Sequence, residues 1–204
     1  VAPGIGVTLA RAGHILGSSI VHADLADRHV VFSGDLGRSG HPLLRDPEPI
    51  GDADWIVVES TYGDRHHDET MDVMALRDVI AQTTGQGGTV VIPAFAVDRT
   101  EVLLYHLDRL ADAGQLPDVP IYVDSPMSLA TLRVYRAAIH ARIPEIREGV
   151  PDDTTPFLEG RVHEVTDVED SKRLTASDAP KVIIAASGMA TGGRVVHHLA
   201  RFVS

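Results

Sequence analysis

Short apolar runs separated by polar turns dominate the first third of the chain. They predict strands over residues 7–10, 20–24, 30–32 and 55–58. Ala26-Asp27-Arg28 is a tight-turn sequence between the second and third of these strands, which indicates a hairpin. Residues 38–52 are rich in glycine and proline and are expected to form a loop. This part of the chain is therefore predicted to be β-rich, with polar residues gathered at strand ends.

From about residue 68 the pattern changes to apolar strands that alternate with amphipathic helices. Buried strands are expected over residues 90–92, 121–123 and 181–185, whereas residues 144–180 are expected to be irregular. Asp98 and Glu101 have the spacing of a capping box at the start of one helix. Alternation of this kind predicts an α/β fold with a parallel sheet covered on both faces. We predict two domains, residues 1–67 and residues 68–204.

The composition limits the chemistry that the chain can use. Of its 204 residues 44% are apolar, which allows a sizeable core, and 29 acidic against 18 basic side chains give a formal charge of −11. This balance argues against a protein that holds nucleic acid by bulk charge, although a local basic groove stays compatible with it. Because the chain has no cysteine, disulfides and cysteine-based zinc sites are excluded. A metal site would need histidine and carboxylate ligands.

The ends of the chain and its apolar runs bear on where the protein acts. No apolar run approaches the roughly 20 residues needed to span a bilayer, and Val1-Ala2-Pro3-Gly4 lacks the methionine and the basic region of a signal peptide. We therefore expect a cytoplasmic protein without membrane contact. Neither end has a clear terminal element, which predicts a piece of a longer protein, truncated at both ends.

Three polar residues that follow predicted strands are candidates for a metal site. His14 lies in a glycine-flanked turn, where it is either a solvated turn residue or an imidazole ligand. Asp35 follows a strand between glycines, where it is either a turn former or a carboxylate that bridges two metal ions. Glu59 ends an apolar strand and is either part of a capped turn or a carboxylate that orients a catalytic histidine.

A glycine-rich turn joins the last predicted strand to the terminal helix. It differs from nucleotide-binding loops of the Walker A and G-x-G-x-x-G types, but a glycine turn at a helix N-terminus still favours an anion such as phosphate. The residues of this turn that we expect to contact phosphate or substrate are Ser187, Gly188, Thr191, Gly192, Gly193 and Arg194. The helix carries His197 and His198, which are either one core and one surface residue or include a proton donor.

Further phosphate contacts are expected from polar residues that open helices after strands. These residues are Arg99, Thr100, Ser125 and Ser128. Each of them also fits a helix cap or a solvated helix end.

Six segments resemble, in this order, the motifs of one known family. They are Gly13-His14-Ile15-Leu16-Gly17-Ser18, Ser33-Gly34-Asp35-Leu36-Gly37, Glu59-Ser60-Thr61-Tyr62-Gly63, residues 92–100, Asp124-Ser125-Pro126-Met127-Ser128 and residues 188–199. The first two resemble the third and fourth metal motifs of the metallo-β-lactamase superfamily. The third resembles the acidic motif at the start of the β-CASP insertion, and the last resembles the second β-CASP motif. The chain is thus similar to the β-CASP nuclease branch, in particular to bacterial and archaeal relatives of the mRNA 3′-end processing nuclease subunit.

The resemblance implies an αββα domain with an inserted Rossmann-like β-CASP domain, and an active site with two zinc ions in the cleft between them. It implies that His14 ligates one zinc, that Asp35 bridges both, and that Glu59 hydrogen-bonds a motif histidine. That histidine, the general acid, would be His197, or His198 if the register shifts by one. Arg99 or Arg194 would steady the phosphate charge.

The resemblance implies a zinc-dependent ribonuclease whose substrate is RNA. It leaves undecided whether the protein forms a homodimer and whether it acts as an endonuclease or an exonuclease. The family's His-x-His-x-Asp-His cluster and its last β-CASP histidine are absent from these 204 residues, so this piece alone is expected to bind zinc poorly and to be inactive. The alternatives are a non-catalytic β-CASP relative that binds RNA or a partner nuclease, a DNA-directed nuclease, and a hydrolase for small substrates.

Overall fold

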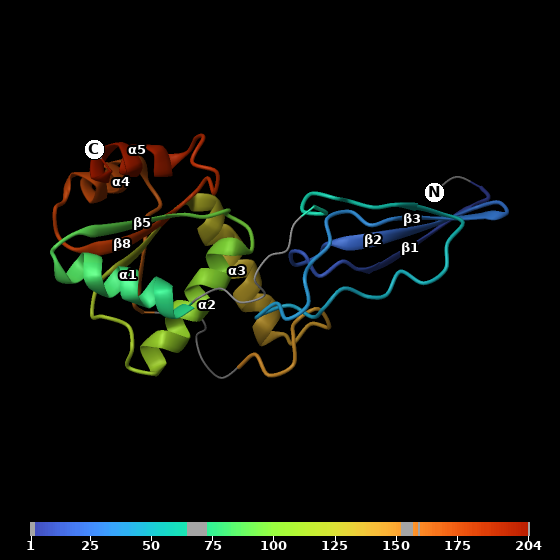
Figure 1. The fold of residues 1–204 in the computed structure, drawn as a ribbon, viewed down its shortest axis with the longest axis horizontal. Coiled ribbons are helices and arrows are strands. Elements are labelled where there is room, and N and C mark those ends of the chain that lie inside the picture. Colours follow the sequence, from blue (N-terminus) through green and yellow to red (C-terminus); the bar gives the residue numbers. More distant parts are fainter. Residues whose placement is uncertain (1–2, 65–72, 152–156, 159, 204) are drawn as a thin grey trace. The chain divides into compact units, whose positions relative to one another are not determined.

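The computed structural model describes residues 3–64, 73–151, 157–158 and 160–203, which form two compact units (Figure 1). The first unit comprises Val1–Met71 together with Arg142–Val150, and the second comprises Asp72–Ala141 together with Pro151–Ser204. The boundary predicted at residues 67–68 lies outside the described residues. The sequence patterns give no sign that Arg142–Val150 returns to the first unit.

The first unit is built on a four-stranded sheet in the order β1-β2-β3-β4. Its strands are β1 (Ile5–Arg11), β2 (Ser19–Leu25), β3 (Arg28–Phe32) and β4 (Trp55–Val57). The first three are antiparallel, and β4 runs parallel to β3. The four predicted strands and the predicted hairpin turn are therefore confirmed. As β1, β3 and β4 point the same way, their carboxyl ends meet at one edge of the sheet.

The two faces of this sheet differ, because side chains alternate along each strand. One face is packed around the buried residues Ala12, Ile20 and Val31, which the long loop after β3 covers with Ile50 and Ala53. The opposite face carries large apolar side chains that are 40–66% exposed: Ile5, Val7, Leu9, Phe32, Trp55 and Val57. In a sandwich of two sheets, a face of this kind packs against the second layer.

The returning segment Arg142–Val150 is joined to the first unit by backbone hydrogen bonds. Leu44 and Ile146 form an antiparallel bridge, and the Arg45 amide donates to the Glu145 carbonyl at 2.9 Å. The Glu145 carboxylate also accepts a hydrogen bond from the Gly17 amide at 2.7 Å. The segment therefore supports the turn between β1 and β2.

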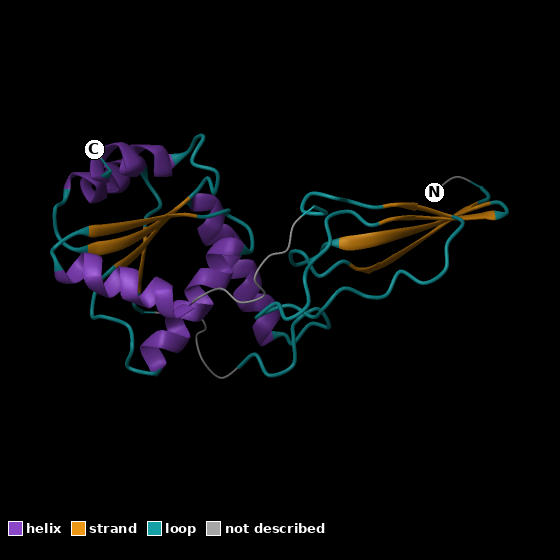
Figure 2. Ribbon diagram, viewed as in Figure 1, coloured by secondary structure: helices purple, strands orange, loops and turns teal. Residues whose placement is uncertain are grey.

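The second unit is a parallel sheet in the order β5-β8-β6-β7 with helices on both faces (Figures 1 and 2). Its elements are α1 (Val73–Gly85), β5 (Thr89–Pro93), α2 (Arg99–Asp112), β6 (Ile121–Asp124), α3 (Pro126–His140), β7 (Val162–Glu164), α4 (Val168–Ala176), β8 (Lys181–Ala185) and α5 (Arg194–Phe202). Helices α4 and α5 cover one face, and α1, α2 and α3 cover the other. The predicted α/β fold is confirmed.

Strand β8 is buried along its whole length because it lies between β5 and β6 with helices on both sides. Ile183 and Ala185 pack with Val165, Leu174 and Val195 under α4 and α5. None of the helices among the described residues is both long and apolar enough to cross a membrane.

Two local predictions are wrong. Residues 144–180 include β7 and α4 and so are not wholly irregular. The expected capping box does not form, because the Asp98 carboxylate makes no cap hydrogen bond to α2 and accepts one from the Tyr135 hydroxyl at 2.9 Å.

Candidate active site

Three loops at one edge of the first sheet carry His14, Asp35 and Glu59. These residues follow the carboxyl ends of β1, β3 and β4, as their positions after predicted strands suggested. The His14 loop is closed by Ser18, whose side-chain oxygen accepts hydrogen bonds from the amides of His14 and Ile15 at 3.0 and 3.2 Å. His14 and Glu59 are 45 positions apart in the sequence. The topology of the sheet therefore brings the three candidates to one region of the first unit.

Direct backbone contact brings the His14 and Asp35 loops together. The Gly37 amide donates to the Ala12 carbonyl at 2.8 Å, and a Cβ placed on Gly37 would lie only 1.8 Å from the Gly13 carbonyl oxygen. No side chain fits in that space, so glycine is required for the approach. Gly37, two residues after Asp35, thus has a packing role in addition to its place in the sequence motif.

The imidazole of His14 and the carboxylate of Asp35 face each other across this junction. His14 Nε2 lies 3.9 Å from Asp35 Oδ2, and their side chains are 45% and 75% exposed. An imidazole nitrogen and a carboxylate oxygen are both ligands that zinc takes in proteins. Two such donors side by side on solvent-accessible loops can contribute to a metal site and leave room for further ligands.

Glu59 holds the Asp35 loop in place. Its carboxylate accepts hydrogen bonds from the Leu36 amide and from the Thr61 amide, each at 3.1 Å, and its own amide donates to the hydroxyl of buried Ser33 at 3.0 Å. Hydrogen bonds from the Thr61 side chain and from the Leu36 and Thr61 amides hold the pKa of Glu59 below its usual value, with a smaller contribution from His14. Glu59 is therefore an ionised carboxylate that positions the residue next to Asp35.

Among residues 3–64, 73–151, 157–158 and 160–203, the His, Asp and Glu side chains do not gather in groups of three or more that could hold a metal ion. Within the first unit the described candidates for metal ligands are therefore the pair His14 and Asp35, with Glu59 engaged in hydrogen bonds to the loop.

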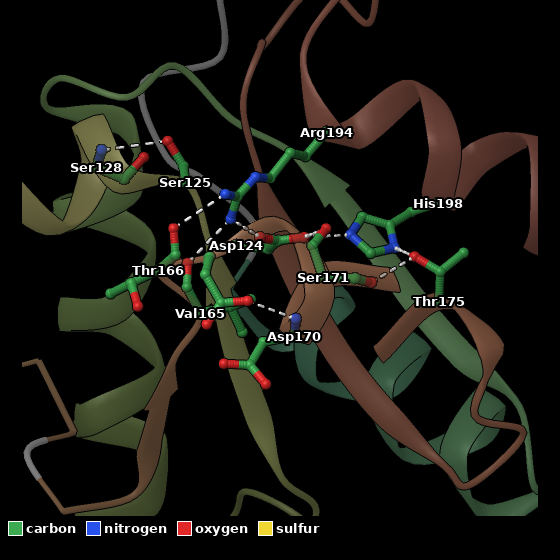
Figure 3. Close-up of polar contacts among 11 residues, drawn as sticks. Asp124, Ser125, Ser128, Val165, Thr166, Asp170, Ser171, Thr175, Arg194 and His198 are labelled. Atoms are coloured by element: carbon green, nitrogen blue, oxygen red, sulfur yellow. Dashed lines mark hydrogen bonds and ion pairs between the residues drawn. The ribbon is translucent and has the colours of Figure 1, made fainter. Parts of the chain in front are cut away.

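In the second unit, a buried ionic network centres on Asp124 at the end of β6 (Figure 3). Its carboxylate accepts from Arg194 Nη1 and the Ser171 hydroxyl, each at 2.6 Å, and lies 2.7 Å from His198 Nε2. Burial by itself would raise the pKa of Asp124, but the hydrogen bonds from His198, Ser171 and Arg194 outweigh it and hold the pKa below its usual value. The network ties α4 and α5 to β6.

This placement corrects the prediction for His198 as a proton donor. His198 is fully buried, with Nε2 at Asp124 and Nδ1 3.1 Å from the Thr175 hydroxyl. Both ring nitrogens are thus engaged inside the unit, where a substrate cannot reach them. His197, one position earlier on α5, is exposed. The helical stripe of Val195, His198, Leu199 and Phe202 was the sequence signal for this burial.

Arg194 also makes hydrogen bonds inside the unit. Besides Asp124, its guanidinium donates to the carbonyl oxygens of Val165 at 3.1 Å and Thr166 at 3.0 Å (Figure 3). The guanidinium thus joins α5 to the end of β7, and the phosphate contact of Arg194 stays a prediction.

Three of the predicted phosphate-binding hydroxyls are buried and hydrogen-bonded to the protein. Ser125 caps α3 by accepting from the Ser128 amide at 3.2 Å, and the Thr100 hydroxyl donates to the Phe95 carbonyl at 2.9 Å. The side chains of Thr100 and Ser128 are 3.4 Å apart. Ser125 therefore has the capping role that was the alternative to phosphate binding, whereas the hydroxyls of Thr100 and Ser128 are engaged with each other and with the Phe95 carbonyl.

The glycine-rich turn before α5 is closed by its own hydrogen bonds. The Ser187 amide and hydroxyl both lie 3.3 Å from the Gly192 carbonyl, and a Cβ on Gly193 would lie 2.5 Å from the Ala186 carbonyl oxygen. Thr191 and Arg99 are exposed. Phosphate contacts by Ser187, Gly188, Thr191, Gly192, Gly193 and Arg99 stay predictions.

Glu101 is a buried acid that the sequence analysis placed only in a helix cap. Its side chain is fully buried on α2, and its carboxylate has no close side-chain hydrogen-bond donor among the described residues. Burial, with a smaller effect of nearby Asp98, raises the pKa of Glu101 from 4.5 to about 8. Glu101 is therefore protonated at neutral pH.

We expect Glu101 to make stability fall with rising pH. Because its pKa is higher in the folded state, the folded protein binds the proton more tightly than the unfolded chain. The free energy of unfolding should thus decrease between pH 4.5 and 8, by at most about 1.4 kcal/mol per pH unit, and level off above pH 8. Glu101→Gln should remove this slope and leave stability below pH 4.5 nearly unchanged. Hydrogen exchange of β5 and β8 amides from pH 5 to 8 measures it.

The matched control for Glu101 is Glu169→Gln on α4, since the Glu169 side chain is 69% exposed. This variant should keep the wild-type slope. Equal slopes in wild type and Glu101→Gln would contradict the assignment of the buried proton to Glu101.

The described residues form an α/β protein with a parallel-sheet unit and a β-rich unit that carries an exposed His–Asp pair. Comparison with known proteins identifies its family. The Beta-Casp domain family matches residues 100–204. The chain therefore belongs to the β-CASP family, the nuclease branch of the metallo-β-lactamase superfamily that the sequence motifs indicated.

Three curated relatives illustrate the similarity. Ribonuclease TTHA0252 of Thermus thermophilus is 37% identical over 96% of this chain and 45% of its own length. The RNase J-like protein of Methanocaldococcus jannaschii is 31% identical over 92% of this chain and 44% of its own. The transcription termination factor FttA of Pyrococcus abyssi is 35% identical over 97% of this chain and 31% of its own. The chain thus spans less than half the length of these relatives.

Proposed function

We propose that the protein containing this chain is a zinc-dependent nuclease that hydrolyses RNA phosphodiester bonds. The observation that carries this proposal is the pairing of His14 and Asp35, whose nitrogen and oxygen lie 3.9 Å apart on two loops in backbone contact. Membership of the β-CASP family and the names of the ribonuclease and RNase J-like relatives support RNA as the substrate.

The donor set fits part of a zinc site. His14 would supply an imidazole nitrogen and Asp35 a carboxylate oxygen, both of which zinc takes as ligands in proteins. Both side chains are accessible, whereas the Glu59 carboxylate accepts hydrogen bonds from two backbone amides. When bound, zinc would lower the pKa of a water molecule and polarise the phosphate. His14 and Asp35 would hold the metal, and Glu59 would keep the Asp35 loop in position.

For protonation of the leaving oxygen we propose His197, the exposed member of the histidine pair on α5. An imidazole can donate a proton near neutral pH if its ring is accessible. The burial of His198 leaves His197 as the α5 histidine with an accessible ring.

The proposal is tested on the full-length protein with a single-stranded RNA oligonucleotide and a DNA oligonucleotide of the same sequence. We expect cleavage of the RNA, loss of cleavage after removal of metal with a chelator, and its return on addition of zinc. RNA cleavage that survives complete removal of metal would contradict the metal dependence. Cleavage of DNA alone would overturn the assignment of RNA as the substrate.

Variants of the two adjacent histidines separate chemistry from folding in the same assay. His197→Ala should lower the rate of RNA cleavage while zinc content and stability stay at wild-type values. His198→Ala should lower stability, because it leaves the Asp124 carboxylate without one of its partners. Wild-type rates in His197→Ala would remove His197 from the reaction.

A further inference from the structure

Three large apolar side chains are exposed just after neighbouring strands of the second sheet, two of them in loops and one, Met127, in the first turn of α3. Phe95 follows β5 and is 53% exposed, Met127 follows β6 and is 65% exposed, and Met189 follows β8 and is 69% exposed. The strands are parallel and adjacent in the order β5-β8-β6, so the three segments that follow them lie at one edge of the sheet. In open parallel sheets, ligands bind outside the carboxyl ends of the strands.

Phe95 is held from one side and open on the other. A Cβ on Gly188 would lie 2.7 Å from Phe95 Cδ2 and 2.8 Å from the Phe95 amide nitrogen, so the ring rests directly against the glycine backbone. The Phe95 carbonyl is fixed by the Thr100 hydroxyl at 2.9 Å. An aromatic ring with one side packed on backbone and half of its surface exposed is a flat, preformed contact surface.

The same contacts connect Phe95 to the two methionines. Gly188, which packs on the ring, directly precedes Met189. Thr100, which binds the Phe95 carbonyl, lies 3.4 Å from the side chain of Ser128, the residue after Met127. The buried hydroxyls of Thr100 and Ser128 and the close approach of Gly188 therefore link the three chain segments that carry Phe95, Met127 and Met189.

The chemistry of this patch suits an unpaired nucleobase. Bases of single-stranded RNA stack on aromatic rings, and thioether side chains make favourable contacts with aromatic groups. Exposed Arg99 opens α2 at the same end of the sheet and supplies positive charge for a phosphate backbone. The Asp98 carboxylate beside it is engaged by the Tyr135 hydroxyl.

We propose that Phe95 is a base-stacking residue for single-stranded RNA, with Met127 and Met189 as its apolar flanks. The inference rests on the proposed function, since it takes RNA to be the ligand. The Phe95 ring would stack on a base of the RNA without sequence preference, because every base presents a flat aromatic face.

The test measures binding of a short single-stranded RNA to the full-length protein in the presence of a chelator, which prevents cleavage. A second series carries one abasic nucleotide at successive positions. Phe95→Ala and Phe95→Leu should weaken binding of the normal strand by about 5- to 100-fold, whereas Phe95→Trp should keep it within a few-fold of wild type. In wild type one abasic position should weaken binding by a similar factor, and in Phe95→Ala that position should have little further effect.

The matched control is Val79→Ala, since Val79 on α1 is an apolar side chain with the same 53% exposure as Phe95. This variant should bind like wild type. If wild type binds RNA and Phe95→Ala binds equally well, the stacking inference is overturned while the proposed function stands. If Phe95→Leu binds as well as Phe95→Trp, the contact is apolar and not stacking, which also overturns it. Wild type that binds no RNA overturns the proposed function itself.

Discussion

Asp124→Asn is expected to destabilise the second unit by about 3–5 kcal/mol, because removing one member of a buried ionic network leaves the others without a counter-charge. Asp124 is fully buried and is the common partner of Arg194, His198 and Ser171, which come from α5 and α4. An asparagine keeps the size of the side chain, so the loss measures charge and hydrogen bonding and not a cavity. The destabilisation is measured by hydrogen exchange of β6 and β8 amides in the full-length protein.

The matched control for Asp124 is Asp178→Asn. Asp178 also accepts from an arginine, Arg201, at 2.6 Å, but its side chain is 81% exposed. Exposed pairs contribute roughly 0–1 kcal/mol, so this variant should change stability little. Equal effects of the two substitutions would show that burial of the Asp124 network does not set its contribution.

The network also predicts how the second unit responds to acid. The pKa of Asp124 is lower in the folded protein than its ordinary value of 3.8. Its contribution to stability is therefore present above pH 3.8 and is lost as the pH falls from there through the folded-state pKa. Asp124→Asn should lack this part of the acid sensitivity.

Asp35→Ala is expected to lower RNA cleavage by the full-length protein by about 10³-fold or more. In the proposed function, bound zinc would activate a water molecule and polarise the phosphate, which would contribute several kcal/mol to the rate, and each 1.36 kcal/mol is a factor of about ten. Asp35 is exposed and lies in a loop fixed by Gly37 and Glu59, so its removal should cost metal binding with little change in stability. Cleavage rate and zinc content are measured on the same samples.

The cleavage rates of two further variants serve as comparisons for Asp35→Ala. Glu59→Gln should lower cleavage by roughly 10- to 100-fold, because Glu59 positions the loop through the Leu36 amide and does not itself hold the metal. Asp27→Asn, at the tip of the hairpin and 86% exposed, should have no effect. A loss of activity in Asp35→Ala with unchanged zinc content would contradict its assignment as a ligand.

The positions of His14, Asp35 and Glu59 after strand ends were predictable because strand ends depend on local rules. An apolar run that ends in a polar residue predicts a strand end, and His14, Asp35 and Glu59 were identified in this way. The sheet order then places the ends of β1, β3 and β4 at one edge. What the pattern did not show is the backbone contact between Gly37 and Gly13, because close packing of two loops leaves no periodicity in the sequence.

Helix α4 and strand β7 were not predicted, because elements with few apolar residues give only a weak sequence pattern. Helix α4 has only two buried residues, Ser171 and Leu174, and β7 has three residues. A helix of that length buries too little apolar surface to produce a clear stripe, and most of its stability comes from packing against its neighbours. The assignment of residues 144–180 as irregular therefore failed where tertiary contacts stabilise the elements.

The sequence by itself determined the family, the alternation of strands and helices, and the three polar strand ends, because periodicity and short motifs are local properties of the chain. Only the tertiary structure showed that His198 is buried and His197 exposed, that Arg194, Ser125 and Thr100 make internal hydrogen bonds, and that Glu101 is buried. The physical reason is that burial and hydrogen-bond partners depend on residues distant in sequence, such as Asp124 for His198, 74 positions away. The type of a residue determines which chemistry its side chain can perform, and the packing around the side chain determines whether a substrate can reach it.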